Sequence, residues 1–259
     1  MNRILSGTFA GLCALAMSAA WTAPASAQDE SKERPPLYTY VSNWAIPRPQ
    51  WAEIEKADAA DRPLLDKAVA DGTIVGYGDD INLVHGPEGI THDEWWSANS
   101  MAGVLKVLES FYKAGTPASP VLASATKHSD ALFVSRHYHW HSGSFKGAYT
   151  RFATYKLKPD APADAIETLS KNLFDPLLEK LMADGAILEY EIDSEAIHTE
   201  SPGTFWVTFI AANAEGLDKF NAALQDATRS APLAVPALGS MVDCTPHRDG
   251  LASSVGTYK

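Results

Sequence analysis

Cysteine is almost missing from this sequence of 259 residues, which holds only Cys13 and Cys244. Cys13 lies in an N-terminal segment that we expect to be removed, so the mature chain keeps one thiol and has no internal disulfide. One thiol is also too few for a cysteine-rich zinc site. A lone thiol can pair between chains or act as a nucleophile, but we interpret Cys244 as a small, buried and inert side chain.

Basic residues are scarce too: 21 lysines and arginines stand against 32 aspartates and glutamates, a formal net charge of −11. Nucleic acids and anionic lipids both need a basic surface, so neither is an expected partner. The sequence has no Gly-x-Gly-x-x-Gly or phosphate-binding loop, no Gly-x-Ser-x-Gly and no His-Glu-x-x-His. These absences argue against several large classes of nucleotide-binding and hydrolytic enzymes.

Long hydrophobic runs are confined to the N-terminus, where Arg3 precedes an apolar stretch over residues 4–20. The stretch is short for a membrane span, which needs about 20 mostly apolar residues. Ala25-Ser26-Ala27 follows and is typical of a signal-peptide cleavage site. We predict a signal peptide over residues 1–27, a mature chain with no stable membrane span, and a periplasmic or secreted location. An uncleaved anchor is the alternative.

A sequence repeat organises the rest of the chain. Residues 63–85 and 176–198 align without a gap at an offset of 113 and are identical at 11 of 23 positions. Shorter matches flank this block: Tyr38-Thr39 with Tyr149-Thr150, Trp96 with Trp206, and Thr-x-His-x-Asp-x-Leu at residues 126–132 and 245–251. A long period that occurs twice indicates a duplicated domain rather than a solenoid. We predict one repeat over residues 28–140 and a second over residues 141–259.

Both repeats show the same order of secondary structure. Alternating and helical hydrophobic patterns predict strand, helix, strand, strand, helix and a final extended segment. In the first repeat these elements span residues 37–44, 49–70, 73–83, 94–98, 101–113 and 133–141; in the second the first five span 148–157, 162–183, 186–197, 204–211 and 214–227. This β-α-β-β-α-β order is the ferredoxin-like motif, which leaves one sheet face uncovered. We predict an α+β fold in which two ferredoxin-like repeats pack sheet-to-sheet as an intramolecular α+β barrel.

In element order and duplication, the chain resembles the dimeric α+β-barrel superfamily, which includes NIPSNAP-like, EthD-like and antibiotic-biosynthesis-monooxygenase-like proteins. The resemblance covers nearly all of the mature chain, here as a tandem duplication. It implies a barrel whose interior serves as the site for very different chemistry, and it brings no catalytic motif with it. Function must therefore be argued from individual residues.

The most unusual local feature is a histidine run, Arg136-His137-Tyr138-His139-Trp140-His141. On a strand, His137, His139 and His141 share one face, and imidazoles at this spacing can hold zinc or copper. The second repeat has no such run. One interpretation is therefore a metal or haem site that takes a further ligand from another part of the chain. The other is a polar strand face that borders solvent or the binding pocket of an organic ligand.

Histidine and aspartate also recur as pairs in both repeats, His128 with Asp130 and His247 with Asp249. A carboxylate beside an imidazole raises its pKa and suits it to general base work, so these four residues are the catalytic candidates. Their presence in both repeats favours a structural role in anchoring the last strand. We interpret His85 and His198, which end matching strands, as loop-capping residues.

Aromatic residues give a separate set of candidates for ligand binding. Tyr40, Tyr77 and Tyr190 lie on predicted strands, and Arg151 replaces an aromatic residue at the position that matches Tyr40. Arginine among aromatics can hold an anionic or planar ligand. A glycine-containing turn is expected at residues 143–147. We expect the two strands that it joins to lie side by side, which would place Arg151 near His137 or His139. Core packing is the alternative for all these residues.

The sequence therefore favours an exported barrel protein that binds a small organic molecule in its interior, as a monomer or a homodimer. Cofactor-independent oxygenation, isomerisation or cyclisation is the chemistry that we consider, and no cofactor is expected. One alternative is a haem- or divalent-metal-binding barrel that uses the His137, His139 and His141 run. Another is a non-catalytic interaction protein of the cell envelope.

Overall fold

A computed structural model describes residues 34–230 and 234–259. The predicted signal peptide and the side chain of Cys244 lie outside the described part, so the interpretations given for them stay predictions. In the described part, no helix combines the length and the apolar character that a membrane crossing requires.

The first part of the chain contains four strands and three α-helices. The elements are β1 (Leu37–Trp44), α1 (Trp51–Ala70), β2 (Gly76–Asn82), β3 (His92–Ala98), α2 (Met101–Ala114), α3 (Pro120–Ala123) and β4 (His128–Trp140). Short 3-10 turns at Arg48–Gln50 and Thr116–Ala118 precede α1 and α3. The predicted order is confirmed, although β4 begins five residues before the predicted final segment.

The second part repeats this order with longer strands. It contains β5 (Gly143–Leu157), α4 (Ala165–Leu169), a π-helical turn (Ser170–Phe174), α5 (Asp175–Ala183), β6 (Ile187–Glu195), β7 (Thr204–Ala211), α6 (Ala214–Ser230), α7 (Ala234–Met241) and β8 (Val242–Tyr258). Helices α1 and α5 both end before an Asp-Gly pair, where Gly72 and Gly185 have φ values of +77° and +63°. Glycine adopts this left-handed conformation without strain, as the sequence predicts for both helix ends.

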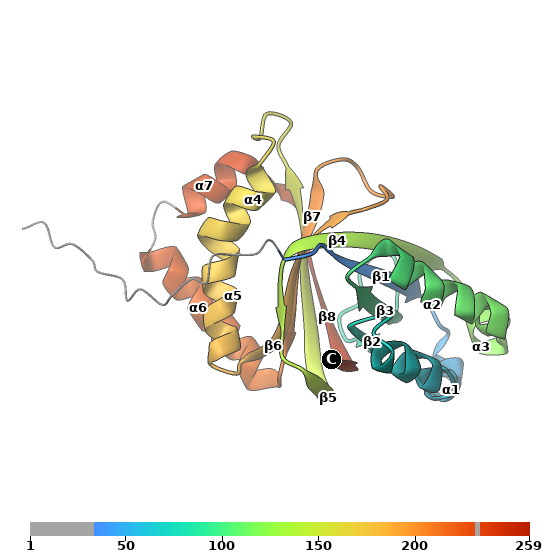
Figure 1. Cartoon of the computed structure of the whole chain (residues 1–259). Helices are drawn as coiled ribbons and strands as arrows, with labels where there is room; N and C mark the ends of the chain where they lie inside the picture. The colour runs from blue at the N-terminus through green and yellow to red at the C-terminus, as the bar shows by residue number, and fades with distance from the viewer. Residues whose placement is uncertain (1–33, 231–233) are drawn as a thin grey trace, which may run out of the picture. The chain divides into compact units, whose positions relative to one another are not determined.

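The eight strands form one closed antiparallel barrel (Figure 1) in the order β1-β3-β2-β8-β5-β7-β6-β4. The order contains two sets of four, β4-β1-β3-β2 and β8-β5-β7-β6, as split β-α-β connections produce. Pairing of β2 with β8 and of β4 with β6 closes the barrel at both seams. The predicted α+β class and closed barrel are confirmed.

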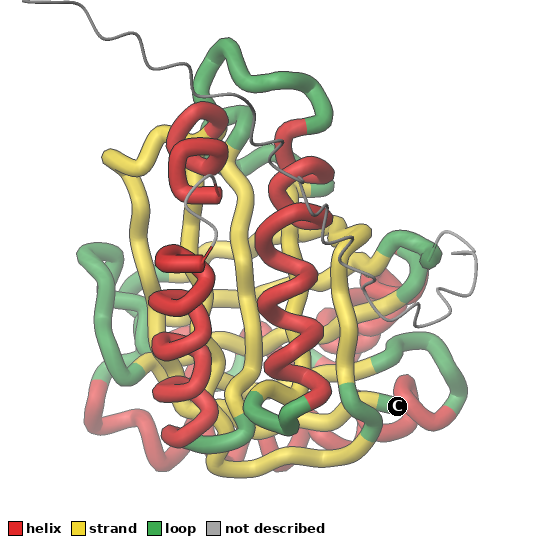
Figure 2. The backbone as a smooth tube through the Cα atoms, turned by 90° about the vertical axis from the view of Figure 1, so that its left-hand side faces the viewer, coloured by secondary structure: helices red, strands yellow, loops and turns green. Residues whose placement is uncertain are grey.

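Helices cover the outside of the barrel. Helices α1 to α3 lie against the strands of the first set, and α4 to α7 lie against the second set (Figures 1 and 2). Because side chains alternate along a strand, one half of them packs under the helices and the other half faces the interior. Trp96, Phe209 and Leu178 are among the largest side chains buried in the outer layers.

Strand pairing corrects two sequence-based expectations. Strand β4 pairs with β1 and β6, whereas β5 pairs with β7 and β8, so the strands on either side of the short connection are not adjacent. The partner of Tyr40 on β3 is Trp96, and the partner of Arg151 on β7 is Phe209. Since Arg151 matches Tyr40, the residue that matches Trp96 is Phe209 rather than Trp206. The predicted match of Trp96 with Trp206 is therefore wrong.

Candidate functional site

The barrel interior contains a cavity of about 500 Å³. A volume of this size is within the range of small-molecule sites. Its walls come from all eight strands and from the loop between β6 and β7. The lining residues are Thr39, Val41, Asn43, Asp80, Asp93, Trp95, Ser129, Asp130, Ala131, Phe133, Thr150, Phe152, Glu189, Glu191, Asp193, Glu195, Thr199, Glu200, Trp206, Thr208, Ile210 and Tyr258.

A row of four acidic residues on β6 dominates one wall. Glu189, Glu191, Asp193 and Glu195 occupy alternate positions, so all four point into the cavity, and all are buried. Thr39 on β1 donates a hydrogen bond to Glu191 Oε2 over 2.8 Å. Burial raises the pKa values of Glu189, Glu191 and Asp193, and the proximity of these carboxyl groups to one another raises those of Glu189 and Asp193 further.

Two further acids approach this row from the opposite set of strands. Burial raises the pKa of Asp80 on β2 to about 7 and that of Asp93 on β3 to about 7. Thr150 donates a hydrogen bond to Asp80 Oδ1 over 3.1 Å, and Asn82 donates one to Asp93 Oδ2 over 2.8 Å. These bonds favour the ionised carboxylates, but desolvation is the larger effect. Both acids can therefore gain or lose a proton near neutral pH.

Three carboxyl oxygens on the cavity wall have no hydrogen-bond partner in the protein. They are Asp93 Oδ1, Glu189 Oε1 and Asp193 Oδ1, each shielded from solvent. Leaving a buried polar atom unpaired costs about 1–3 kcal/mol, so such atoms in native proteins call for an explanation. Their position beside one cavity is an arrangement that suits a ligand with hydrogen-bond donors.

Aromatic rings pack together at one end of the interior. Trp95, Trp140 and Phe145 gather around Tyr258, with ring centroids 5.4, 5.4 and 6.5 Å from that of Tyr258. A Cβ atom on Gly76 would lie 2.3 Å from the Tyr258 ring. Glycine on β2 therefore leaves the space that this ring occupies.

The opposite end of the cavity reaches the surface. Ser129 at the start of β4 and Glu200 in the β6–β7 loop are both exposed and both line the cavity. Glu195, at the end of the acidic row, accepts hydrogen bonds from the backbone N–H groups of Thr199 and Glu200 and from the Thr199 hydroxyl. The row thus also fixes the loop at the entrance.

The histidine run lies outside the barrel, against α4 and α5. His137, His139 and His141 do share a face, as the sequence predicts, but a register shift between Ser135 and His137 reverses the alternation. Such a β-bulge inserts one extra residue and changes which side chains face each side. Trp140 consequently packs with the interior rings, and the histidines turn toward the helices.

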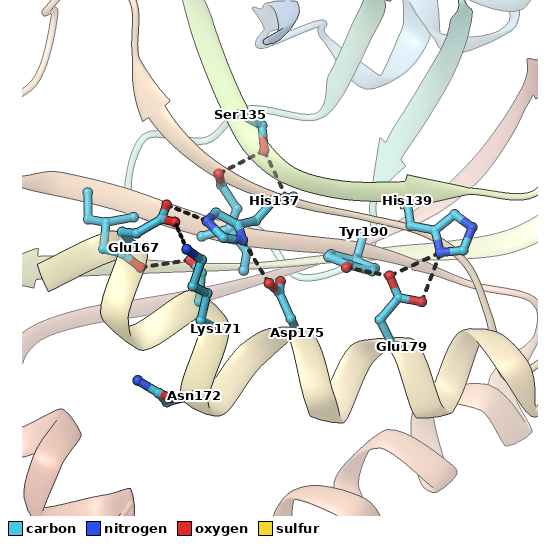
Figure 3. A network of polar contacts seen from close by, with 12 residues as sticks. Ser135, His137, His139, Glu167, Lys171, Asn172, Asp175, Glu179 and Tyr190 are labelled. Carbon is cyan, nitrogen blue, oxygen red and sulfur yellow. Dashed lines mark hydrogen bonds and ion pairs between the residues drawn. The ribbon is translucent and has the colours of Figure 1, made fainter. Parts of the chain in front are cut away.

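Both ring nitrogens of His137 are occupied by carboxylates (Figure 3). Nδ1 lies 2.7 Å from Asp175 Oδ2, and Nε2 lies 2.7 Å from Glu167 Oε2. The hydrogen bond with Asp175 is the largest influence that raises the pKa of His137. An imidazole with both nitrogens donating has no lone pair for a metal or haem iron. His137 is therefore a charged link between β4 and the helices.

His139 and His141 also contact the helix layer. His139 Nδ1 lies 2.9 Å from Glu179 Oε2, and His141 Nε2 lies 3.2 Å from the carbonyl oxygen of Met182. In the described part of the chain, no three histidine, cysteine, aspartate or glutamate residues are arranged to hold a metal ion. The bulge directs His137 and His139 toward the helices, so the structure does not bring them to the cavity, and their role in ligand binding stays a prediction.

Arg151 and the three candidate tyrosines also face the helices. Tyr40 stacks on Trp96 with ring centroids 4.6 Å apart, and Arg151 contacts Asn221, Asp249 and the Phe220 ring. None of the four is among the residues that line the cavity, and all four pack in the outer layer, so their expected role in ligand binding stays a prediction.

Tyr77 and Tyr190 make matching contacts. Tyr77 donates to Asp66 over 2.6 Å, and Tyr190 donates to Glu179 over 2.8 Å. In both pairs, residues of one repeat lie 113 positions from those of the other. The same tyrosine–carboxyl bond therefore ties a strand to a helix in each half of the barrel.

The paired histidines and aspartates form local contacts in both halves. His128 Nε2 lies 3.0 Å from Asp130 Oδ1, and His247 Nε2 lies 3.3 Å from Asp249 Oδ1. The ring of His128 stacks on Trp44, and that of His247 packs against Tyr155. Of these four candidates, Asp130 alone is among the cavity-lining residues, at the entrance.

The remaining two histidines lie in loops. His85 Nε2 lies 2.9 Å from the carbonyl oxygen of Asn82, as expected of a residue that caps a strand end. His198 is exposed in the β6–β7 loop.

Sequence reasoning missed the acidic row, although its signal is present. Residues 186–197 were predicted as a strand, and Glu189, Glu191, Asp193 and Glu195 alternate along it. Alternation alone places these four acids on one face of the strand. The residues between them are mostly apolar and would pack under the helices, which would turn the acidic face toward the interior. Comparison of the repeats adds to this signal, because Gly76 and Gly78 occupy the positions that match Glu189 and Glu191.

No family model matches the chain, and no curated protein matches it by sequence. Solved structures do match. A candidate monooxygenase from Lactobacillus acidophilus is 13% identical with a TM-score of 0.59, over 85% of this chain and 93% of that one. A candidate monooxygenase from Fusobacterium nucleatum is 7% identical with a TM-score of 0.62, over 86% and 94%. An anthrone oxidase-like protein is 11% identical with a TM-score of 0.53, over 87% and 94%.

The chain shares the α+β-barrel fold of these proteins. Identities this low show the fold alone, and they carry no catalytic residue from one protein to another. The resemblance to monooxygenase-like barrels is thereby supported at the level of architecture, whereas a specific relation to NIPSNAP-like or EthD-like proteins stays a prediction.

Proposed function

We propose that this protein binds a small organic molecule in the barrel interior and that the carboxyl groups there transfer protons to and from it. The observation that carries the proposal is the set of buried, unpartnered carboxyl oxygens on the wall of a cavity of about 500 Å³. Acids of this kind are unusual in a protein core unless they serve a ligand or a reaction.

The chemistry follows from two kinds of carboxyl group side by side. A carboxylate can accept a proton from a bound molecule, while a neighbouring carboxylic acid returns one at a second atom. Asp80 and Asp93, with pKa values of about 7, suit both roles near neutral pH. Such a transfer moves a double bond without any change in oxidation state, as in isomerisation and some cyclisations.

The names of the structural neighbours fit an enzyme of this general kind. Two of them are candidate monooxygenases and one is anthrone oxidase-like. Removal of a proton from a carbon acid also begins cofactor-independent oxygenation, in which the carbanion then reacts with molecular oxygen. Proton abstraction in the cavity is therefore the step that we propose, and oxygenation would follow it only for a substrate whose carbanion reacts with molecular oxygen.

The proposal includes the architecture and the location given by the sequence. Two ferredoxin-like repeats, residues 28–140 and 141–259, would form within one chain the barrel that two subunits form in a dimeric relative. The two matching sets of four strands and the tyrosine–carboxyl pairs at an offset of 113 support this duplication. The N-terminal pattern supports export to the periplasm or the medium.

Filling the cavity tests the binding site. Ala131 lines the cavity on β4, and Ala131→Trp would place an indole in it, whereas Ala60 is exposed on α1 and Ala60→Trp is the matched control. A small-molecule library is screened by thermal shift against the parent. We expect compounds that stabilise the parent to stabilise Ala60→Trp equally and Ala131→Trp much less. Equal stabilisation of both variants would contradict an interior site.

Deuterium exchange tests the chemistry. Compounds found in the screen are incubated with the protein in D₂O, and NMR follows the replacement of C–H by C–D. General acid–base catalysis by a positioned group contributes about 10²–10⁴-fold, so Asp93→Asn or Asp80→Asn should slow exchange by a factor in this range. Exchange at the rate of the buffer control would show that the cavity binds without transferring protons.

A further inference from the structure

We infer that the ligand of this cavity is an organic cation, with an ammonium, amidinium or guanidinium group joined to an apolar and planar body. The inference rests on the proposed interior site and deepens it by assigning the chemical class of the molecule. Four features of the wall carry it: the sign of the charges, the unpartnered oxygens, the arrangement of the rings and the spacing of the acids.

The charge on the wall has one sign. Eight lining residues carry carboxyl groups, and none of the lining residues is lysine, arginine or histidine. The eight are Asp80, Asp93, Asp130, Glu189, Glu191, Asp193, Glu195 and Glu200. Burial raises the pKa values of Asp80, Asp93, Glu189, Glu191 and Asp193, and a cation bound among them would favour their ionised forms. An anionic ligand would meet no lysine, arginine or histidine side chain among the lining residues.

With a cation bound beside them, these carboxyl groups are ionised, and their unpartnered oxygens then accept hydrogen bonds and need donors. Asp93 Oδ1, Glu189 Oε1 and Asp193 Oδ1 belong to three different residues on two sides of the cavity. Glu189 and Asp193 are 2% and 3% exposed, so solvent at the surface does not satisfy them. An ammonium group offers three donors and a guanidinium offers five, and their bonds to carboxylates are about twice as strong as neutral ones.

The rings on the wall suit the rest of such a molecule. Phe133 on β4 and Trp206 on β7 lie on the two strands that flank β6, and their ring centroids are 4.8 Å apart. The ring centroids of Trp95 and Tyr258 are 5.4 Å apart. Aromatic faces attract cations within about 6 Å and also stack on planar groups. An apolar body against the rings, with its charged end toward β6, would meet both parts of the wall.

A metal ion is the competing cation, and the geometry disfavours it. Ca²⁺ needs six to eight oxygen ligands gathered around one point, and zinc needs about four. The acids of β6 instead follow one another along a strand, where the Cα atoms of successive inward residues are about 6.6 Å apart. In the described part of the chain, no three acidic, histidine or cysteine side chains converge on one such point. A larger ion with dispersed N–H donors matches this spacing better.

Matched trios of compounds test the inference. Each trio has one aromatic skeleton ending in an amine, an alcohol or a carboxylate, as in tryptamine, tryptophol and indole-3-propionate, and binding is measured by calorimetry at pH 7.5. We expect the amine to bind more tightly than the alcohol by about tenfold or more, and the carboxylate to bind least. Equal binding of amine and alcohol, or the absence of binding by any amine in the set, overturns the inference.

Isosteric amides identify the groups responsible. Glu189→Gln and Asp193→Asn keep the size of each side chain while removing its charge, and Asp218→Asn removes an exposed acid on α6 as the matched control. The two cavity variants should reduce the preference for amine over alcohol to less than about threefold, and the control should leave it unchanged. Circular dichroism checks that each variant folds. An unchanged preference in both cavity variants also overturns the inference.

These outcomes separate the two proposals. If alcohols or carboxylates bind best and Ala131→Trp blocks them, the interior site stands and the cationic class is wrong. If amines bind but Ala131→Trp does not block them, the acids of the outer surface attract them and both proposals fail. Calcium and zinc chlorides are titrated in parallel, and binding of either ion more tightly than any amine would assign the site to a metal.

Discussion

His137 shows how a residue with the features of a metal ligand can instead serve as a structural link. It is 12% exposed, and its two nitrogens contact Asp175 on α5 and Glu167 on α4. The sequence indicates three histidines on one face but not which face, because no pattern in it marks the bulge at Arg136. A polar residue between two carboxylates is held by charge-assisted hydrogen bonds, which gives this run a physical reason without a metal.

We predict that His137→Ala lowers the free energy of unfolding by about 2–3 kcal/mol at pH 6, because hydrogen bonds to charged groups contribute this much. The pKa of His137 is raised in the folded state, so its contribution is complete below its unfolded pKa of about 6.5 and is lost as pH rises through the folded value. The pKa of Glu167 is lowered in the folded state, so the stability that its carboxylate contributes is lost as pH falls through the folded pKa.

Urea denaturation at pH 6 and pH 9 measures the effect, and His139→Ala is the control. His139 is 37% exposed beside Glu179, and its removal should cost less than about 1 kcal/mol. The difference between the two variants should shrink at pH 9. A His137→Ala cost that is the same at both pH values would show that packing, rather than charge, is what the imidazole contributes.

At the scale of the elements, the sequence predicts strand and helix positions well and predicts side-chain direction unevenly. The periodicity of residues 148–157 or 204–211 is set locally, so it can be read from the sequence. Direction on β4 depends on one extra residue whose partner strand is more than 50 positions away in the chain. The acidic row was missed for another reason: buried acids contradict the expectation that charged residues face solvent.

We predict that deleting Arg136 destabilises the protein by more than about 3 kcal/mol. The deletion would restore regular alternation on β4, turning Trp140 away from the interior rings and His137 away from its carboxylates. Arg136 itself is exposed, so Arg136→Ala should change stability by no more than about 0.5 kcal/mol. Chemical denaturation of both variants gives the comparison, and similar stabilities would mean that β4 tolerates either register.

At the scale of the whole molecule, buried acids reverse the usual dependence of stability on pH. The pKa values of Asp80 and Asp93 are raised to about 7 and that of Asp58, on α1, to about 8, mainly by burial. The pKa values of Glu94, Glu189, Glu191 and Asp193 are raised as well. Between pH 4 and the raised values the folded chain binds more protons than the unfolded chain, so stability falls as pH rises.

We therefore predict a melting temperature that is higher at pH 5 than at pH 8. Asp80 and Asp93, with folded pKa values of about 7, each contribute on the order of 3 kcal/mol to the difference between pH 5 and pH 8, and the melting temperature should fall by about 10 °C or more. Scanning calorimetry across this range measures it. The Asp80→Asn, Asp93→Asn double variant should have a flatter profile, and a parent that is more stable at pH 8 than at pH 5 would contradict the pKa assignments.

The ring cluster around Tyr258 has a consequence for traffic through the barrel. Trp95, Trp140 and Phe145 pack around Tyr258 at one end of the cavity, and exposed Ser129 and Glu200 line an opening at the other end. A molecule that uses this opening both to enter and to leave must depart before the next one can bind. Glu195 holds the adjacent loop through the backbone N–H groups of Thr199 and Glu200, so the exchange of ligands there depends on how readily that loop moves.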